Sequence, residues 1–120
     1  MTEMNLTLET NEEAPRISRQ KLSEIRSEVE PRYDDLALVI SELVSNSVRH
    51  SGQATVSISV KTKANRVRLE VSDPGPGFDP DQPAGDGMGL RIVGRIADAW
   101  GIESNDECTV WVEVDLQVAT

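Results

Sequence analysis

Hydrophobic and polar residues alternate along several segments of the chain, which is the pattern of strands that bury one face. Residues 66–73 are the clearest example, because apolar side chains occupy every second position from Val67 to Val71. Ala64 and Asn65 separate this segment from the preceding one and predict a hairpin turn. The expected strands are residues 4–8, 54–63, 66–73, 102–104 and 108–118.

Elsewhere the apolar residues recur at spacings of three and four, which is typical of amphipathic helices. Residues 33–50 show this most clearly, and the Ser-Gly pair that follows them should end the helix. Residues 15–30 have a weaker helical pattern, which stops at Pro31. Residues 89–100 form the last predicted helix.

The predicted order of elements is β-α-α-β-β-loop-α-β-β. A chain of 120 residues forms one domain on grounds of size, here residues 1–120. We therefore expect an α+β fold, a two-layer α/β sandwich with a mainly antiparallel sheet and helices on one face.

Charge and cysteine content narrow the classes of function. The formal net charge of −9 argues against a nucleic-acid-binding surface, and it would repel phosphates unless a metal ion or a local cation is present. Cys108 is the single cysteine, so the chain can form no internal disulfide; a small core residue is favoured over a reactive thiol. No run of about 18 apolar residues is present, and the N-terminus lacks the features of a signal peptide. The expected location is cytoplasmic, without membrane contact.

Polar residues on the predicted helix at 33–50 provide the first group of candidate site residues. They fall on the side opposite an apolar stripe, and an ordinary solvated face is the alternative interpretation. Asparagine is a mediocre helix former, but its side-chain oxygen suits a hard metal ion such as Mg²⁺. Glu42 could accept a proton or orient a hydroxyl, and Arg49 could offset phosphate charge. The polar set is Glu42, Asn46, Arg49 and His50, and the stripe is Leu36, Ile40, Leu43, Val44, Ser47 and Val48.

Asp73 ends the predicted strand at 66–73 and continues the phase of its apolar residues, so its carboxylate should point toward the core. A buried acid needs a hydrogen-bond donor, and the exocyclic amine of adenine is one. Capping of the turn before Pro74 is an equally weighted alternative. Gly75 and Gly77 follow, and they allow a ligand to approach the backbone closely.

A glycine turn, Gly87-Met88-Gly89, comes directly before the last predicted helix. Helix N-termini present free N–H groups and a positive dipole end, so they bind phosphate readily. The motif alone is weak, since most such glycines only form a turn. Here it follows residues 74–86, which are rich in proline, glycine and aspartate and could close as a lid.

Together these three segments resemble the N, G1 and G2 boxes of the GHKL ATPase superfamily. The wider sequence looks most like its small bacterial branch of anti-sigma-factor serine/threonine kinases and histidine-kinase-like ATPase domains. The resemblance covers roughly residues 5–116 and rests on segments that start at Glu42, Asp73, Gly87 and Thr109. It implies the Bergerat ATP-binding fold, ATP and Mg²⁺ as ligands, and serine/threonine-protein kinase activity.

The resemblance also implies a role for each residue. Asn46 would bind the Mg²⁺ that bridges the phosphates, and Glu42 would act as general base on the attacking hydroxyl. Asp73 would bond the adenine amine, with Thr109 beneath it. The other nucleotide-binding positions would be Arg49, His50, Gly75, Gly77, Gly87, Met88, Gly89, Leu90 and Arg91.

Two features depart from the family pattern. Residues 78–86 contain no Lys or Arg, although well-known kinases of the branch carry a basic residue there; Arg49 or Arg91 are the candidates to replace it. Residues 105–108 stand where the family often has a glycine before Thr109. The first departure leaves open whether phosphoryl transfer is efficient, and the second affects the adenine side of the pocket.

The resemblance implies an anti-sigma regulatory factor that phosphorylates an anti-anti-sigma (STAS-type) partner, sequesters a sigma factor and forms a homodimer. One alternative is a partner-switch module that binds ATP poorly or not at all and acts by sequestration. Another is the detached catalytic domain of a histidine kinase. The single histidine, His50, lies within the catalytic helix, so a self-contained histidine kinase is excluded. An unrelated α+β domain with chance motifs is the least favoured interpretation.

Trp111 lies on the phase opposite Val110 and Val112 in the last predicted strand. It marks either an interaction surface or an ordinary packing contact with a long side chain.

Overall fold

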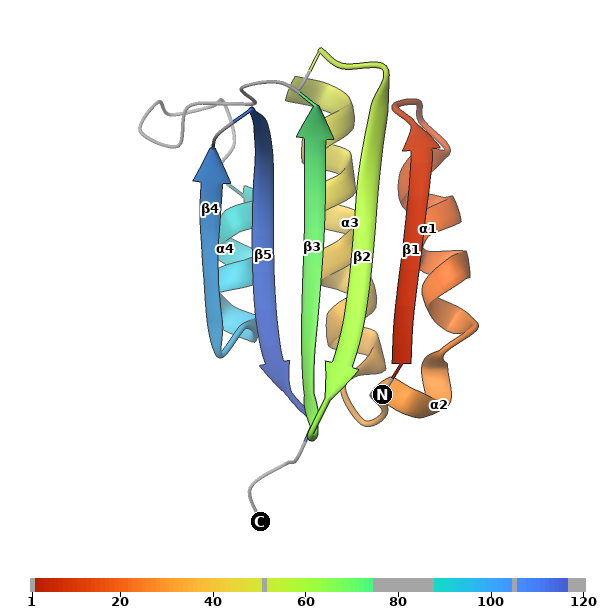
Figure 1. The fold of residues 1–120 in the computed structure, drawn as a ribbon, viewed down its shortest axis with the longest axis vertical. Coiled ribbons are helices and arrows are strands. Elements are labelled where there is room, and N and C mark those ends of the chain that lie inside the picture. Colours follow the sequence, from red (N-terminus) through yellow and green to blue (C-terminus); the bar gives the residue numbers. More distant parts are fainter. Residues whose placement is uncertain (1, 51, 75–87, 105, 117–120) are drawn as a thin grey trace.

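The elements follow one another in the predicted order, except that one more helix precedes the second strand (Figure 1). The computed structural model describes residues 2–50, 52–74, 88–104 and 106–116. The elements are β1 (Thr2–Glu9), α1 (Ala14–Ser23), α2 (Arg26–Val29), α3 (Tyr33–His50), β2 (Thr55–Lys63), β3 (Arg66–Pro74), α4 (Met88–Ile96), β4 (Ala99–Ser104) and β5 (Glu107–Asp115).

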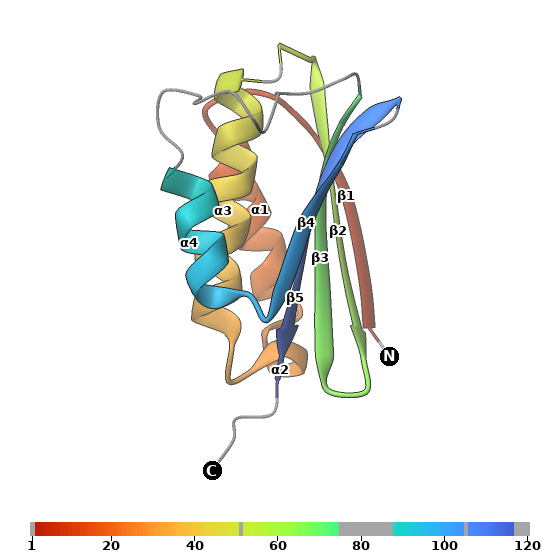
Figure 2. The ribbon, with the colours of Figure 1, turned by 90° about the vertical axis from the view of Figure 1, so that its left-hand side faces the viewer.

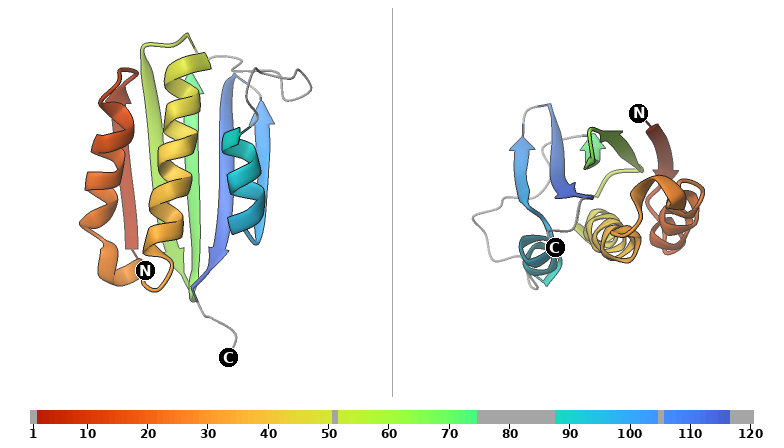
Figure 3. Two further views of the ribbon diagram at one scale, coloured as in Figure 1. Left: turned by 180° about the vertical axis from the view of Figure 1, so that it is seen from behind. Right: turned by 90° about the horizontal axis from the view of Figure 1, so that it is seen from below.

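The strands form one five-stranded sheet in the order β1-β2-β3-β5-β4. Every neighbouring pair is antiparallel. The helices cover one face of this sheet and leave the other face open (Figure 2). Seen from behind, α1 lies over β1, α3 over β2 and β3, and α4 over β4 (Figure 3). The two-layer α+β sandwich expected from the sequence is confirmed.

The hydrophobic core fills the space between the sheet and the helices. In β3 the alternation turns Val67, Leu69 and Val71 toward the helices, and each is at most 3% exposed. Burying a side chain of this size stabilises the fold by about 1.5–3 kcal/mol. The stripe predicted on α3 faces the same core. Core side chains with no exposed surface include Leu22, Val29, Leu36, Val39, Ile40, Val44, Val56, Val60, Val93 and Val112.

The last helix is shorter than the predicted span of residues 89–100. α4 ends at Ile96, and residues 99–104 form the edge strand β4. The N–H of Asp98 donates to the carbonyl oxygen of Glu113 at 2.9 Å, which begins the pairing with β5. Tertiary strand pairing therefore overrides the local helical pattern at the end of this segment.

Two further boundaries differ from the predictions. The segment at 15–30 forms two helices, α1 and α2, rather than one. β5 ends at Asp115 rather than at residue 118, and residues 117–120 lie outside the described part of the chain. None of the helices in the described ranges has the length and apolar character needed to cross a membrane.

Candidate functional site

Asp73 is held at the end of β3 by a hydrogen bond from α3. Its side chain is 6% exposed, and the Oγ of Ser47 donates to its Oδ1. The predicted direction of the carboxylate, toward the core, is confirmed. This contact joins the C-terminal ends of α3 and β3 at the upper end of the molecule in Figure 1. Sequence reasoning placed Ser47 in the apolar stripe but did not find its partner; a hydroxyl at a core position was the available signal.

Glu42 and Asn46 lie one helical turn apart on α3, so their side chains are on the same side of the helix. Both side chains are half-buried. They therefore flank the buried stripe, whereas the sequence pattern placed them on the fully opposite side. A half-buried amide and carboxylate at the rim of the core can be reached by a ligand and still be held in position by their neighbours.

Arg49 is exposed and contacts Asn46 directly. Its Nη2 donates to the Oδ1 of Asn46 at 2.9 Å. The Oδ1 atom is the neutral oxygen that would ligate a metal ion. A cation bound at this oxygen would repel the Arg49 guanidinium, so the two would compete for Oδ1.

Thr109 lies on the other face of the sheet from Asp73. It stands opposite Ser72 in the β3–β5 register, and the two hydroxyl oxygens are 2.8 Å apart. Cys108 is the residue opposite Asp73, and its side chain is 2% exposed. The expected position of Thr109 beneath Asp73 thus does not agree with the strand register. The burial of Cys108 agrees with its predicted place in the core.

The phosphate side of the predicted site is described only in part. α4 begins at Met88, so Met88 and Gly89 of the predicted turn already belong to the helix, which starts one residue earlier than expected. Arg91, in the first turns of this helix, is exposed. The side chains of residues 88–90 and of His50 lie outside the described part of the chain. So do Gly75, Gly77, Gly87 and the predicted lid at 78–86.

The donor set fits a magnesium nucleotide. Within the described ranges, no group of three or more His, Cys, Asp or Glu side chains could hold a metal ion. A cation at Asn46 would therefore depend on the amide oxygen together with oxygens of a bound ligand, and phosphates supply such oxygens. The buried carboxylate of Asp73 can accept a hydrogen bond from an amine on the same ligand.

Comparison with curated proteins gives relatives among bacterial kinases. The sensor histidine kinase LiaS of Bacillus subtilis is 31% identical over 77 residues, which cover 58% of this chain and 21% of LiaS. The serine-protein kinase RsbW of Bacillus velezensis is 28% identical over 117 residues, which cover 78% of this chain and 73% of RsbW. The chain thus spans about a fifth of the first relative and nearly three quarters of the second.

Solved structures share the fold. The RsbU and RsbW domains of Rv1364c from Mycobacterium tuberculosis match 96% of this chain and 32% of that chain, with a TM-score of 0.75 and 23% identity. The Acinetobacter baumannii histidine kinase AdeS matches 98% of this chain and 70% of that chain, with a TM-score of 0.60 and 13% identity. At these identities the likeness concerns the fold.

Residues 32–118 match the family described as histidine kinase-, DNA gyrase B-, and HSP90-like ATPase. The match includes α3, β3, α4 and β5, which carry every predicted site residue that the structure describes. The resemblance predicted from the three sequence boxes is confirmed, and the relatives place the domain among kinase-type ATPases. The chain belongs to the histidine kinase-, DNA gyrase B-, and HSP90-like ATPase family.

Proposed function

We propose that this protein is a cytoplasmic Mg²⁺-ATP-dependent protein serine/threonine kinase of the anti-sigma regulatory type, built as a single domain. The observation that carries the proposal is the hydrogen bond from Ser47, which brings the buried Asp73 next to the turn of α3 that carries Asn46, in a domain of this family. Glu42 lies one helical turn before Asn46. The similarity to a serine-protein kinase along most of that relative's length supports the choice of activity.

Each of the three side chains has a chemical task in this proposal. Asp73 accepts a hydrogen bond from the adenine amine and so selects the base. Asn46 provides an oxygen ligand for Mg²⁺, which neutralises phosphate charge when it is bound. Glu42 accepts the proton of the attacking hydroxyl. Phosphoryl transfer depends mostly on positioning and charge neutralisation, which is what these three groups would supply.

The proposed partners are an anti-anti-sigma protein of the STAS type, which supplies the acceptor serine or threonine, and a sigma factor. The protein would act as a homodimer that sequesters the sigma factor, and phosphorylation of the anti-anti-sigma partner would prevent that partner from releasing it.

Nucleotide binding is tested first, by calorimetry with ATP and GTP in the presence and absence of Mg²⁺. Asn46→Ala should reduce Mg²⁺-dependent ATP affinity by about 10–100-fold, because the only proposed protein ligand of the metal is lost. Asp73→Asn should reduce the preference for ATP over GTP, because the acceptor for the adenine amine is changed. Arg16→Ala, at an exposed position of α1, is the control and should bind like wild type. Absence of ATP binding by the wild type would refute the site.

Phosphoryl transfer is tested separately with labelled ATP and candidate anti-anti-sigma proteins. Glu42→Gln should lower transfer by about 10²–10⁴-fold while ATP binding is retained, because the general base is removed. A stable sigma-factor complex without any transfer would instead identify a partner-switch module that acts by sequestration.

A detached histidine-kinase catalytic domain is the second candidate, and the sensor histidine kinase among the relatives favours it. In that case the acceptor is a histidine of another chain. Phosphohistidine is labile in acid and phosphoserine is stable, so acid treatment of the labelled partner separates the two candidates.

A further inference from the structure

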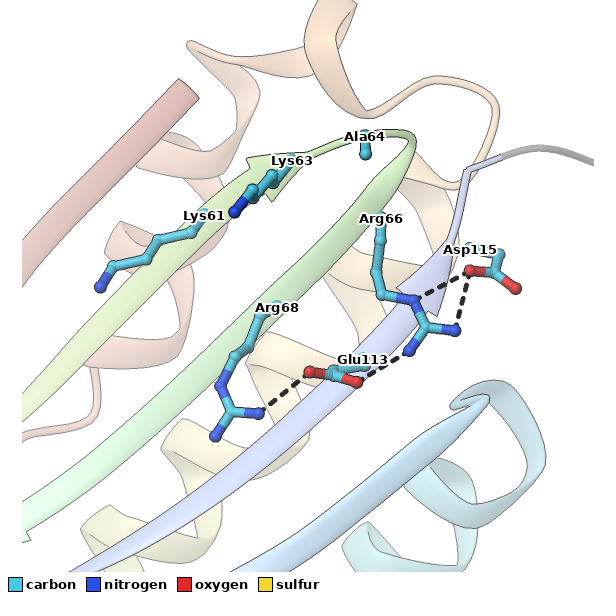
Figure 4. A pocket seen from close by; sticks show the side chains of 7 residues that line it. All are labelled: Lys61, Lys63, Ala64, Arg66, Arg68, Glu113 and Asp115. Atoms are coloured by element: carbon cyan, nitrogen blue, oxygen red, sulfur yellow. Dashed lines mark hydrogen bonds and ion pairs between the residues drawn. The ribbon is translucent and has the colours of Figure 1, made fainter. Parts of the chain in front are cut away.

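A basic pocket lies on the open face of the sheet, beside the β2–β3 turn (Figure 4). Its volume is about 510 Å³, which is within the range of about 300–1,000 Å³ for ligand sites. The turn is at the lower end of Figure 1, whereas Asp73 is at the upper end of β3 and faces the helices. The pocket is therefore separate from the proposed nucleotide site. It is lined by Lys61, Lys63, Ala64, Arg66, Arg68, Glu113 and Asp115.

Carboxylates from β5 already pair with the two arginines. Arg66 contacts Glu113 at 2.8 Å and Asp115 at 3.1 Å, and Arg68 contacts the second oxygen of Glu113 at 3.0 Å. The negative charge of Asp115 is the main cause that raises the pKa of Arg66 above its ordinary value. The hydrogen bond to Glu113 raises this pKa further. Arg68 also lies 3.6 Å from Glu70. These contacts hold both guanidinium groups on the β5 side of the pocket.

Lys61 and Lys63 face residues of like charge on the neighbouring strand. Lys61 stands opposite Arg68 and Lys63 opposite Arg66 in the β2–β3 register, so like charges face each other across the strands. Such pairs destabilise a sheet. No residue in the described ranges forms an ion pair with either lysine. Glu3 is the acidic residue opposite Lys61 on β1, and it accepts a hydrogen bond from Asn5.

We propose that this pocket binds an extended acidic segment of a partner protein, with Glu or Asp at every second position. Lys61 and Lys63 are two residues apart on one strand face, so their Cα atoms are about 7 Å apart. The same repeat separates alternate side chains of an extended peptide. The partner's carboxylates pair with the two lysines, and its backbone lies over the aliphatic parts of the lysine and arginine side chains.

Charge and size favour a peptide over a nucleic acid. The net charge of −9 repels a long polyanion, and only two cations of the pocket lack a carboxylate partner among the described residues. Glu113 and Asp115 line the far side and restrict an anionic ligand to the β2 side. A short segment with two or three carboxylates satisfies these limits.

The test uses NMR amide shifts of the protein in low-salt buffer without nucleotide, so the outcome does not depend on the proposed kinase activity. The probe is a blocked peptide of alternating threonine and glutamate, and the control peptide has glutamine in place of glutamate. The glutamate peptide should shift the amides of residues 61–68, and the glutamine peptide should not. The combined Lys61→Gln and Lys63→Gln variant should bind about tenfold more weakly, and Arg at both positions should restore binding.

The matched control combines Lys21→Gln with Arg16→Gln, which removes the same two positive charges from exposed positions on α1. Equal binding by this variant and by the double glutamine variant would overturn the proposal. So would the absence of shifts at millimolar peptide, or equal shifts with inorganic phosphate, which would identify a simple anion site. A dimer in sedimentation that the double variant dissociates would also overturn it, because a second copy would then cover the pocket.

Discussion

Asp73 is a buried carboxylate, and such a group is stable only where hydrogen-bond donors reach it. Ser47→Ala removes one donor and should lower the free energy of unfolding by about 1–3 kcal/mol. It should also weaken ATP binding, because the carboxylate is no longer held in place. Urea unfolding and calorimetry measure the two effects. Ser45→Ala, at a half-buried position of the same helix, should change both much less. Equal effects of the two substitutions would show that the Ser47 contact does not matter.

Gly101 faces the ring of Trp111 across the β4–β5 pair. A Cβ at this position would lie 2.8 Å from the ring, which is closer than real Cβ contacts. Gly101→Ala should therefore displace the indole from its contact with Arg68, whose guanidinium carbon lies 4.6 Å from the ring centroid, and destabilise the fold by about 1–3 kcal/mol. Thermal unfolding measures this.

Gly94→Ala is the matched control, because a Cβ there would meet its nearest neighbour among the described residues, the Trp100 Nε1, at an ordinary 3.8 Å. In a helix this change should be neutral or raise stability by up to about 1 kcal/mol. The cost of Gly101→Ala should also fall when Trp111 is replaced by Ala. If the cost stays the same, the close approach to the ring is not its cause.

For Trp111 the sequence left two interpretations open, an interaction surface or a packing contact with a long side chain. It packs against the long side chain of Arg68 on the open face, so the packing alternative describes its contact. Its half-buried ring is also close to the basic pocket along the same strand, since Glu113 follows two residues later.

At the scale of elements, the β2–β3 hairpin contains an unfavourable turn residue. Ala64 and Asn65 both have positive φ, 51° and 65°, which is the backbone of a type I′ turn. Alanine in this region costs about 1 kcal/mol, and asparagine tolerates it better. Ala64→Asn should therefore raise the melting temperature by a few degrees, and Ala64→Val should lower it. Unchanged stability in both variants would contradict the turn geometry.

The same hairpin shows how much secondary structure the local hydrophobic pattern can predict. β2, β3 and α3 were predicted closely because each has a long, uninterrupted period of two or about 3.6 residues. The end of α4 was not predicted correctly, because its sequence is compatible with a helix up to Trp100. Only pairing with β5 makes residues 99–104 a strand.

The placement of the candidate site residues depends on local pattern in the same way, while their roles stay predictions. Glu42, Asn46 and Asp73 came from motifs that lie within single elements. Thr109 does not lie beneath Asp73 as expected, because strand register decides which face of the sheet a side chain occupies. A shift of the register by one residue moves the side chain to the opposite face. Cys108 therefore faces the helices beside Asp73.

At the scale of the molecule, Arg32 connects three parts of the fold. Its side chain is 21% exposed and donates to Asp35 Oδ2 at 2.8 Å. It also donates to the carbonyl oxygens of Ile96 and Asp115, each at 3.0 Å. The end of α4 and the end of β5 are thus tied to the start of α3.

Arg32→Ala should lower the free energy of unfolding by about 1–3 kcal/mol, because two partly buried carbonyl groups lose their donor. Chemical denaturation measures the change. Arg16→Ala, which removes an exposed arginine paired with Glu13, should cost at most about 1 kcal/mol. A similar cost for the two variants would mean that Arg32 acts only as a surface charge.

The strand order has a consequence for how the molecule opens. β3 is the central strand and is hydrogen-bonded to β2 and β5, whereas β1 and β4 are the edge strands of the sheet formed by the described residues. Opening β3 therefore requires disruption of the whole sheet, while the edges can fray alone. Amide protons of β3 should exchange with deuterium only at the rate of global unfolding, and many in β1 and β4 should exchange much earlier. Asp73 thus lies at the end of the central strand, which we expect to exchange most slowly.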